Sequence, residues 1–286
     1  MADLGMQIAQ QYLSPFDKLI GIVGKAGSGK SMLIKGMFPG LELTNDDKGL
    51  NVRPLPILSV GENETGFYTP HTYHLDIHFE GAFHQMYELA EAIQEAVSLG
   101  KRVIVEHFEL IRDYLDMNAH LLIGIGEEVL ITRPTAYGPE PKDIAAIVHN
   151  SLHYRFMAHT AEDLCGIYLQ GKVEEQYLHD DVRHGFILSF QNEPDINLQE
   201  MEDFVNEKIK ENIRISLKDN NNIMIGDILW PCSGPRMHVK RTGDIKKFSV
   251  AKEFIREPIS NRYLLTGVIG EKVQGEISDL NKIVTT

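Results

Sequence analysis

The sequence has few cysteines and no excess of basic residues. Only two of its 286 residues are cysteines, Cys165 and Cys232, so no disulfide framework is implied and a reducing compartment fits. Lysine and arginine number 28 against 41 aspartates and glutamates, which gives a formal net charge of −13. Because non-specific nucleic-acid binding comes mostly from basic residues that neutralise phosphates, this balance disfavours it.

Long apolar runs are also missing. No such run approaches the length that crosses a bilayer, and the first residues carry Asp3 in place of a basic segment followed by an apolar core. We therefore expect a soluble, cytoplasmic protein without a membrane partner. Hydrophobic residues make up 43% of the chain, enough for one large domain or two ordinary ones. The oligomeric state is left open.

The most informative stretch is residues 24–31, GKAGSGKS, which follows the apolar run 19–23. Two glycines with four residues between them, then a lysine and a small hydroxyl residue, have the spacing of a phosphate-binding loop. An apolar strand before the loop and a helical run after it are the context that this motif requires. The predicted nucleotide-binding residues are Gly24, Lys25, Ala26, Gly27, Ser28, Gly29, Lys30 and Ser31.

Each position in this loop has a chemical reason. The glycines let consecutive backbone N–H groups converge on phosphate oxygens, and the following helix adds the positive end of its dipole. Lys30 would reach the β- and γ-phosphates, and the Ser31 hydroxyl would complete a magnesium coordination sphere. The sequence therefore predicts binding of ATP or GTP with Mg²⁺. A plain glycine-rich turn between a strand and a helix is the alternative.

Two acidic positions are candidates for holding the magnesium ion or orienting the nucleophile. The apolar strand 102–107 carries Glu106 at its carboxyl end, the form of a Walker B element, and ligands sit beyond that end of parallel strands. Asp46 and Asp47 lie in the polar cluster 43–47, where either would bind magnesium through water, although such a cluster is also typical of a turn. The predicted catalytic residues are Lys30, Glu106 and Asp46.

The run 70–79 alternates and would place His74, Asp76 and His78 on one face of a strand. Two histidines and a carboxylate suggest a metal or phosphate contact. A polar outer face opposite the apolar side chains is the interpretation that we favour.

The rest of the sequence indicates two domains. A helical repeat at 81–99 and apolar runs at 121–125 and 129–132 complete a small α/β layer. Residues 134–141 contain three prolines and a glycine and are interpreted as a linker. The predicted domains are 1–135, which binds nucleotide, and 142–286. The second contains a helix over 143–168 and a strand at 186–190.

Separated elements of the second half occur in a characteristic order. His159 and Asp163 lie four apart and therefore on one side of the predicted helix, and Cys232 and His238 precede the turn 242–245. At these residues, roughly 150–250, the chain resembles the second additional domain (SAD) shared by alanyl- and threonyl-tRNA synthetases, which in alanyl enzymes removes wrongly attached amino acids. The whole chain is similar to a small bacterial group named for that domain. The expected fold class is an α/β P-loop NTPase-like domain followed by an α+β SAD-like domain.

The resemblance implies a metal site. In the family, a histidine pair four apart and a Cys-x-x-x-His element bind zinc. Here Asp163 replaces the second histidine, and five residues separate Cys232 from His238. Imidazole, thiolate and carboxylate all bind zinc, so the resemblance implies Zn²⁺ at His159, Asp163, Cys232 and His238, in a harder and weaker site than the family's. The other interpretation is that the site has lost its metal and survives as a relic of the fold.

Three functions follow from these observations. The first is a nucleotide hydrolase or small-molecule kinase whose second domain supplies an amino acid, a nucleoside or an aminoacyl ester. The second is a non-catalytic nucleotide-binding module. The third is a free-standing aminoacyl-tRNA editing hydrolase with a zinc site, which the acidic charge and the altered ligand spacing disfavour. We do not expect the chain to charge tRNA, because the adenylating core and tRNA-reading domains of a synthetase would not fit into this length.

Overall fold

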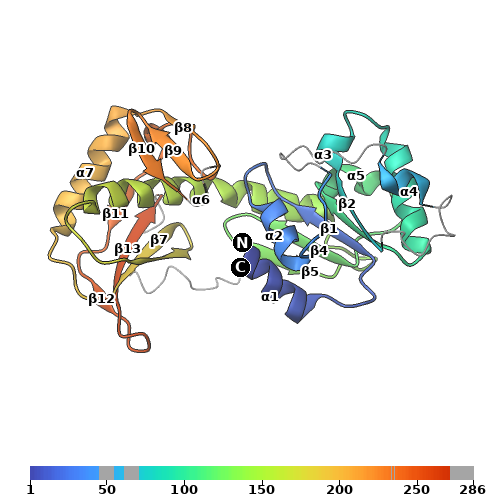
Figure 1. The fold of residues 1–286 in the computed structure, drawn as a ribbon, viewed down its shortest axis with the longest axis horizontal. Coiled ribbons are helices and arrows are strands. Elements are labelled where there is room, and N and C mark those ends of the chain that lie inside the picture. The colour runs from blue at the N-terminus through green and yellow to red at the C-terminus, as the bar shows by residue number, and fades with distance from the viewer. Residues whose placement is uncertain (45–54, 61–70, 233, 235, 271–286) are drawn as a thin grey trace. The chain divides into compact units, whose positions relative to one another are not determined.

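The computed structural model describes residues 1–44, 55–60, 71–232, 234 and 236–270. Asp46 and Asp47 lie outside these residues, so their role stays a prediction. The chain divides into two compact units, Met1–Asn150 and Ser151–Thr286 (Figure 1). The boundary falls inside helix α6 (Pro141–Leu169) and not in the predicted linker 134–141. Pro141 starts this helix, since the first helical turn leaves its N–H groups unpaired and loses nothing to proline.

The first unit is built on one five-stranded sheet. Its strands are β1 (Leu19–Val23), β2 (Thr72–Asp76), β3 (Arg102–Glu106), β4 (Leu121–Ile125) and β5 (Val129–Thr132), in the order β2-β3-β1-β4-β5. Neighbours among β2, β3, β1 and β4 pair in parallel, and β5 runs antiparallel to β4. The α/β class is confirmed. The strands predicted from apolar runs form as expected, because a parallel sheet buried on both faces requires them to be apolar throughout.

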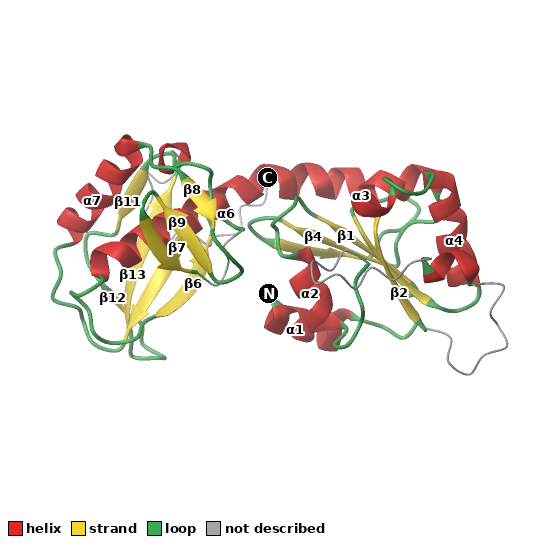
Figure 2. Cartoon of the chain, turned by 45° about the horizontal axis from the view of Figure 1, so that its top comes forward, coloured by secondary structure: helices red, strands yellow, loops and turns green. Residues whose placement is uncertain are grey.

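Helices cover both faces of this sheet (Figure 2). Side chains of α1 (Ala2–Tyr12) and α2 (Lys30–Met37) pack with Ile20 and Ile22 of β1 in one core. On the opposite face, α4 (Met86–Ser98), α5 (Phe108–Ile111) and the first turns of α6 pack around Leu19 and Val23. The short elements of this unit are α3 (Ile77–Glu80), η1 (Pro56–Ser59) and η2 (Arg112–Tyr114). In sheets of this kind, ligands bind beyond the carboxyl ends of the parallel strands.

The second unit combines the rest of α6 with antiparallel sheets. One sheet contains β6 (Leu178–Val182), β7 (Gly185–Phe190), β11 (Phe248–Val250) and β13 (Tyr263–Ile269) in the order β11-β13-β7-β6, with β12 (Ile255–Arg256) paired to β13. The other contains β8 (Ile215–Leu217), β9 (Asn222–Ile225) and β10 (Ile228–Pro231) in the order β10-β9-β8. Helix α7 (Leu198–Glu211) and the turn η3 (Thr242–Asp244) complete the unit.

The core of the second unit forms around α6. Apolar side chains of this helix from Met157 to Leu169 pack with Phe186 and Phe190 of β7 and Met201 of α7. The helix interrupts this apolar surface with a group of buried polar residues, Thr160, Glu162 and Asp163. Buried charges need partners, so this polar group marks a site. Among the described residues, no helix has both the length and the hydrophobicity needed to cross a membrane.

Candidate functional sites

The glycines of the 24–31 loop occupy positions that other residues do not tolerate. Gly27 and Gly29 have φ angles of 82° and 93°, in the left-handed region that glycine adopts without strain. A Cβ atom on Gly24 would lie 2.7 Å from Ser28 Oγ and 3.0 Å from the carbonyl oxygen of Ile125. Gly29 directly precedes α2, so the loop leads into the amino terminus of that helix. A side chain at these glycines would therefore strain the backbone or collide with its neighbours.

The Lys30 side chain turns back into this loop. Its Nζ donates to the carbonyl oxygens of Gly24 at 3.1 Å and Lys25 at 3.2 Å, and it lies 3.8 Å from Glu106 Oε2. The side chain is only 7% exposed. Lys30 therefore places a positive charge inside the loop, where backbone N–H groups at a helix start also favour an anion.

Glu106 is the centre of the polar contacts at this edge of the sheet. The Ser31 hydroxyl donates to Glu106 Oε1 at 3.3 Å, and His74 Nε2 lies 3.1 Å from the same oxygen. Ser31 and Glu106 meet because β1 and β3 are neighbours and Ile22 is paired with Glu106 in their register. Two neighbouring predicted residues, Lys30 and Ser31, thus lie beside a third that is distant in the sequence, Glu106.

His74 holds Glu106 from the neighbouring strand. The backbone N–H of Thr44 donates to His74 Nδ1 at 3.1 Å. Since that N–H can only donate, Nδ1 carries the lone pair, and a neutral His74 has its proton on Nε2, which donates to Glu106. His74 is therefore a positioning residue, and one whose tautomer is fixed by Thr44.

The interpretation of His74, Asp76 and His78 as a polar outer face is wrong. His74 and Asp76 are 4% and 8% exposed, because β3 pairs with β2 and brings Glu106 beside them. The strand ends at Asp76, whose carboxylate accepts from the backbone N–H of Phe79 and caps α3. His78 lies on that helix and not on the strand, so the three side chains do not share a face.

The first unit contains two more histidines and a carboxylate of interest, His107, His149 and Glu109. His107 has a left-handed backbone (φ 58°), and its Nδ1 is 3.4 Å from Glu109 Oε1. Glu109 Oε2 and His149 Nε2 are buried and make no hydrogen bond in the described part of the chain. Burial lowers the pKa of His149, and the charge of Glu109 opposes this shift. No sequence pattern pointed to these residues.

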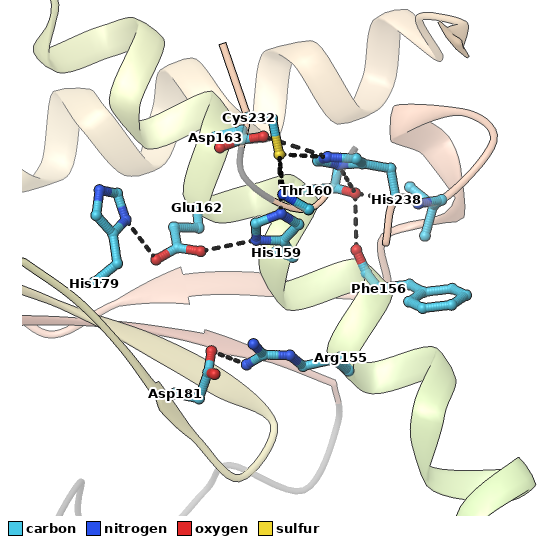
Figure 3. A network of polar contacts seen from close by, with 12 residues as sticks. Arg155, Phe156, His159, Thr160, Glu162, Asp163, His179, Asp181, Cys232 and His238 are labelled. Atoms are coloured by element: carbon cyan, nitrogen blue, oxygen red, sulfur yellow. Dashed lines mark hydrogen bonds and ion pairs between the residues drawn. The ribbon is translucent and has the colours of Figure 1, made fainter. Parts of the chain in front are cut away.

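In the second unit, His159, Asp163, Cys232 and His238 form one cluster (Figure 3). His159 and Asp163 lie on α6, Cys232 directly follows β10, and His238 precedes η3. One ligand atom from each residue lies within 4.8 Å of all the others. The four residues predicted from the family resemblance are therefore brought together, in spite of the aspartate and the longer spacing.

The spacing within the cluster fits a metal ion. His159 Nε2 is 3.2 Å from Cys232 Sγ, which is 3.3 Å from His238 Nε2, and that nitrogen is 3.5 Å from Asp163 Oδ2. Zinc bonds of about 2.0–2.3 Å in a tetrahedron separate ligand atoms by roughly 3.3–3.6 Å. The donor set of two imidazoles, a thiolate and a carboxylate also suits zinc. The cluster can hold a metal ion with little movement.

The hydrogen bonds around His238 direct its lone pair into the cluster. The Thr160 hydroxyl donates to the carbonyl oxygen of Phe156 at 2.8 Å, so toward His238 Nδ1, at 3.3 Å, it can only accept. His238 then carries its proton on Nδ1 and presents the lone pair of Nε2 to Cys232 and Asp163. Such an outer contact fixes a metal-binding imidazole.

The electrostatics of the cluster favour one positive charge. Burial opposes a charge on His159, but hydrogen bonds with Cys232 and Glu162 prevail and raise its pKa to about 10. Burial and the nearby charge of His159 lower the pKa of His238 to about 3. Burial raises the pKa of Asp163 to about 6. The environment of the cluster favours a positive charge. Either a proton on His159 or a bound metal cation would supply it.

No protein-family model matches the chain, and no curated protein is found to be similar to it. Sequence patterns missed Thr44, Thr160, Glu162 and His179, each of which touches a predicted site residue or its contact. Thr160 and Glu162 lie between two predicted ligands in the sequence. An additional carboxylate on an otherwise apolar helix face is a signal that could have identified Glu162.

Proposed function

We propose that the chain binds ATP or GTP with Mg²⁺ in the 24–31 loop and is a nucleotide hydrolase or small-molecule kinase. The observation that carries this proposal is the meeting of Ser31 and Glu106 beside Lys30, at the carboxyl edge of a parallel sheet. A hydroxyl and a carboxylate oxygen 3.3 Å apart are the ligands that magnesium prefers. The glycine loop next to them supplies the phosphate contacts.

The roles of the side chains follow from this arrangement. Lys30 would neutralise charge on the β- and γ-phosphate oxygens, which is the largest contribution a protein makes to phosphoryl transfer. Ser31 and Glu106 would hold magnesium, which would supply positive charge to offset that of the phosphates. His74 would keep Glu106 turned toward Ser31, since it donates to the same carboxylate oxygen.

Titration calorimetry with MgATP and MgGTP tests the binding, and release of phosphate or transfer to an added acceptor tests the reaction. We expect Lys30→Ala to lower turnover by about 10²–10³, as expected when a charge-stabilising group is removed. Lys35→Ala is the matched control, because Lys35 lies on α2 outside the loop. Absence of any nucleotide binding by the wild-type chain would overturn the proposal.

The same measurements separate catalysis from binding alone. A ligand that binds only the folded state raises the melting temperature whether or not it reacts. Stabilisation by nucleotide without product would make the chain a non-catalytic nucleotide-binding module. The acceptors to test are amino acids and nucleosides.

A zinc-dependent editing hydrolase is the second candidate, favoured by the cluster at His159, Cys232 and His238. We propose that this cluster binds Zn²⁺. With Asp163 as a fourth ligand the coordination sphere is closed, which is typical of structural zinc, whereas a hydrolytic site keeps a position open for water. Editing predicts release of amino acid from mischarged tRNA without nucleotide. X-ray fluorescence of the purified protein identifies the metal.

A further inference from the structure

The Glu162 carboxylate connects the candidate metal centre to strand β6 (Figure 3). Its Oε2 lies 3.1 Å from His159 Nδ1, and its Oε1 lies 2.9 Å from His179 Nδ1. The Glu162 side chain is 5% exposed, and that of His179 is 55% exposed. A buried carboxylate is thus held on one side by a candidate ligand and on the other by a histidine at the surface.

The contacts at both Glu162 oxygens set the direction of these hydrogen bonds. A carboxylate accepts at each of its oxygens, so His159 and His179 each donate from Nδ1. His159 therefore directs Nε2 toward Cys232 Sγ, at 3.2 Å.

We propose that Glu162 is the positioning residue of the metal centre and that His179 is its anchor on β6. Glu162 accepts a hydrogen bond from His159 Nδ1–H. This contact fixes the ring so that the Nε2 lone pair faces the other three ligands. The carboxylate also makes that imidazole a stronger ligand. This inference rests on the proposed metal centre. It adds Glu162 and His179, which are not among the four ligands predicted from the sequence.

The two imidazoles of the candidate metal centre have different outer hydrogen-bond partners. His238 has a neutral outer partner, the Thr160 hydroxyl, while His159 has a carboxylate. The negative charge of Glu162 also lies one imidazole away from the cation site. Loss of that charge should therefore weaken metal binding even if the ring keeps its orientation.

The experiment measures Zn²⁺ affinity of the full chain by competition with a chromogenic chelator, and the absorption spectrum of the Co²⁺ form. We expect Glu162→Gln to weaken Zn²⁺ binding by about 10–100-fold, as is usual when the outer partner of a metal-binding histidine is lost. His179→Ala should cause a smaller loss, because the half-exposed His179 acts only through Glu162. Asp180→Asn is the control: it removes a charge from the same strand, and its side chain is exposed.

The outcomes separate the two levels of the proposal. Equal Zn²⁺ affinities for Glu162→Gln and Asp180→Asn would overturn the role of Glu162 while the metal centre stands. Failure of the wild-type chain to bind either Zn²⁺ or Co²⁺ would remove the metal centre itself, and the role of Glu162 with it.

One measurement does not depend on any variant folding. Nitrogen NMR of the histidine rings in the Zn²⁺-loaded wild-type chain reports which nitrogen of His159 carries the proton. We expect a protonated Nδ1 and a metal-bound Nε2. Metal on Nδ1 of His159 would contradict the proposal outright.

Discussion

The two sites of this chain are built in different ways. In the first unit, the 24–31 loop is one contiguous segment whose backbone forms most of the site, and its glycines are required by φ angles and by close contacts. In the second unit, the cluster consists only of side chains, drawn from α6 and from two positions much later in the chain. A backbone site tolerates changes in most of its side chains, whereas a side-chain cluster depends on every member.

Removal of a thiolate should give the largest effect, because it takes away a ligand and not an outer contact. We expect Cys232→Ala to weaken Zn²⁺ binding by more than about 100-fold, above the loss usual for an outer partner. The competition assay measures this loss. Nucleotide binding, which belongs to the other unit, should stay unchanged.

The other cysteine is a matched control for this variant. Cys165 also lies on α6 and is fully buried in the core, but it is not a member of the cluster. Cys165→Ala should leave Zn²⁺ affinity at the wild-type value. A similar loss for both cysteine variants would show that packing, and not ligation, explains the effect.

In the first unit, a change to a side chain that contacts Glu106 should have a smaller effect. We expect His74→Phe to lower Mg²⁺-dependent turnover by about tenfold, which corresponds to about 1.4 kcal/mol. The phenyl ring fills the space but removes the hydrogen bond from His74 to Glu106 Oε1. It also removes the acceptor of the Thr44 N–H. Steady-state kinetics measures the change.

A readout of magnesium dependence makes this test specific. If His74 positions Glu106, the Mg²⁺ concentration that gives half-maximal turnover should rise in His74→Phe. His78→Phe is the control, since His78 is exposed on α3. An unchanged magnesium dependence would show that His74 contributes packing and does not position Glu106.

The difference between the sites also explains what the sequence could predict. Residues 24–31 were recognisable because their spacing is local, and Glu106 because a strand end can be inferred from an apolar run. The alternation of 70–79 showed which side chains share a strand face, but strand order decides what covers that face, so His74 was misplaced. The four cluster residues came from a resemblance. Glu162 and His179 could not be paired from the sequence, because their contact depends on how β6 packs beside α6.

The smallest expected effect concerns an ion pair that stabilises the first unit without belonging to either site. Arg133 donates to Asp17 Oδ1 at 2.6 Å and Oδ2 at 3.0 Å, and the backbone N–H of Ser14 donates to Oδ2 at 2.6 Å. Burial would raise the pKa of Asp17, but these hydrogen bonds outweigh it and hold the pKa below its usual range. Because the folded pKa is the lower one, the stabilisation is present in full above the unfolded pKa of about 3.9 and is lost as pH falls through the folded value.

We therefore expect Asp17→Asn to destabilise the first unit by about 1 kcal/mol at neutral pH, the upper end for an ion pair with an exposed partner. The difference from wild type should shrink as the pH falls below about 4, because protonation removes the same charge from Asp17. Denaturant unfolding at a series of pH values measures this. Asp113→Asn, which breaks the exposed pair with Lys142, is the control and should change stability by less than about 0.5 kcal/mol. A difference between Asp17→Asn and wild type that stays constant down to about pH 2 would mean that the amide disturbs packing and that the charge of Asp17 contributes nothing.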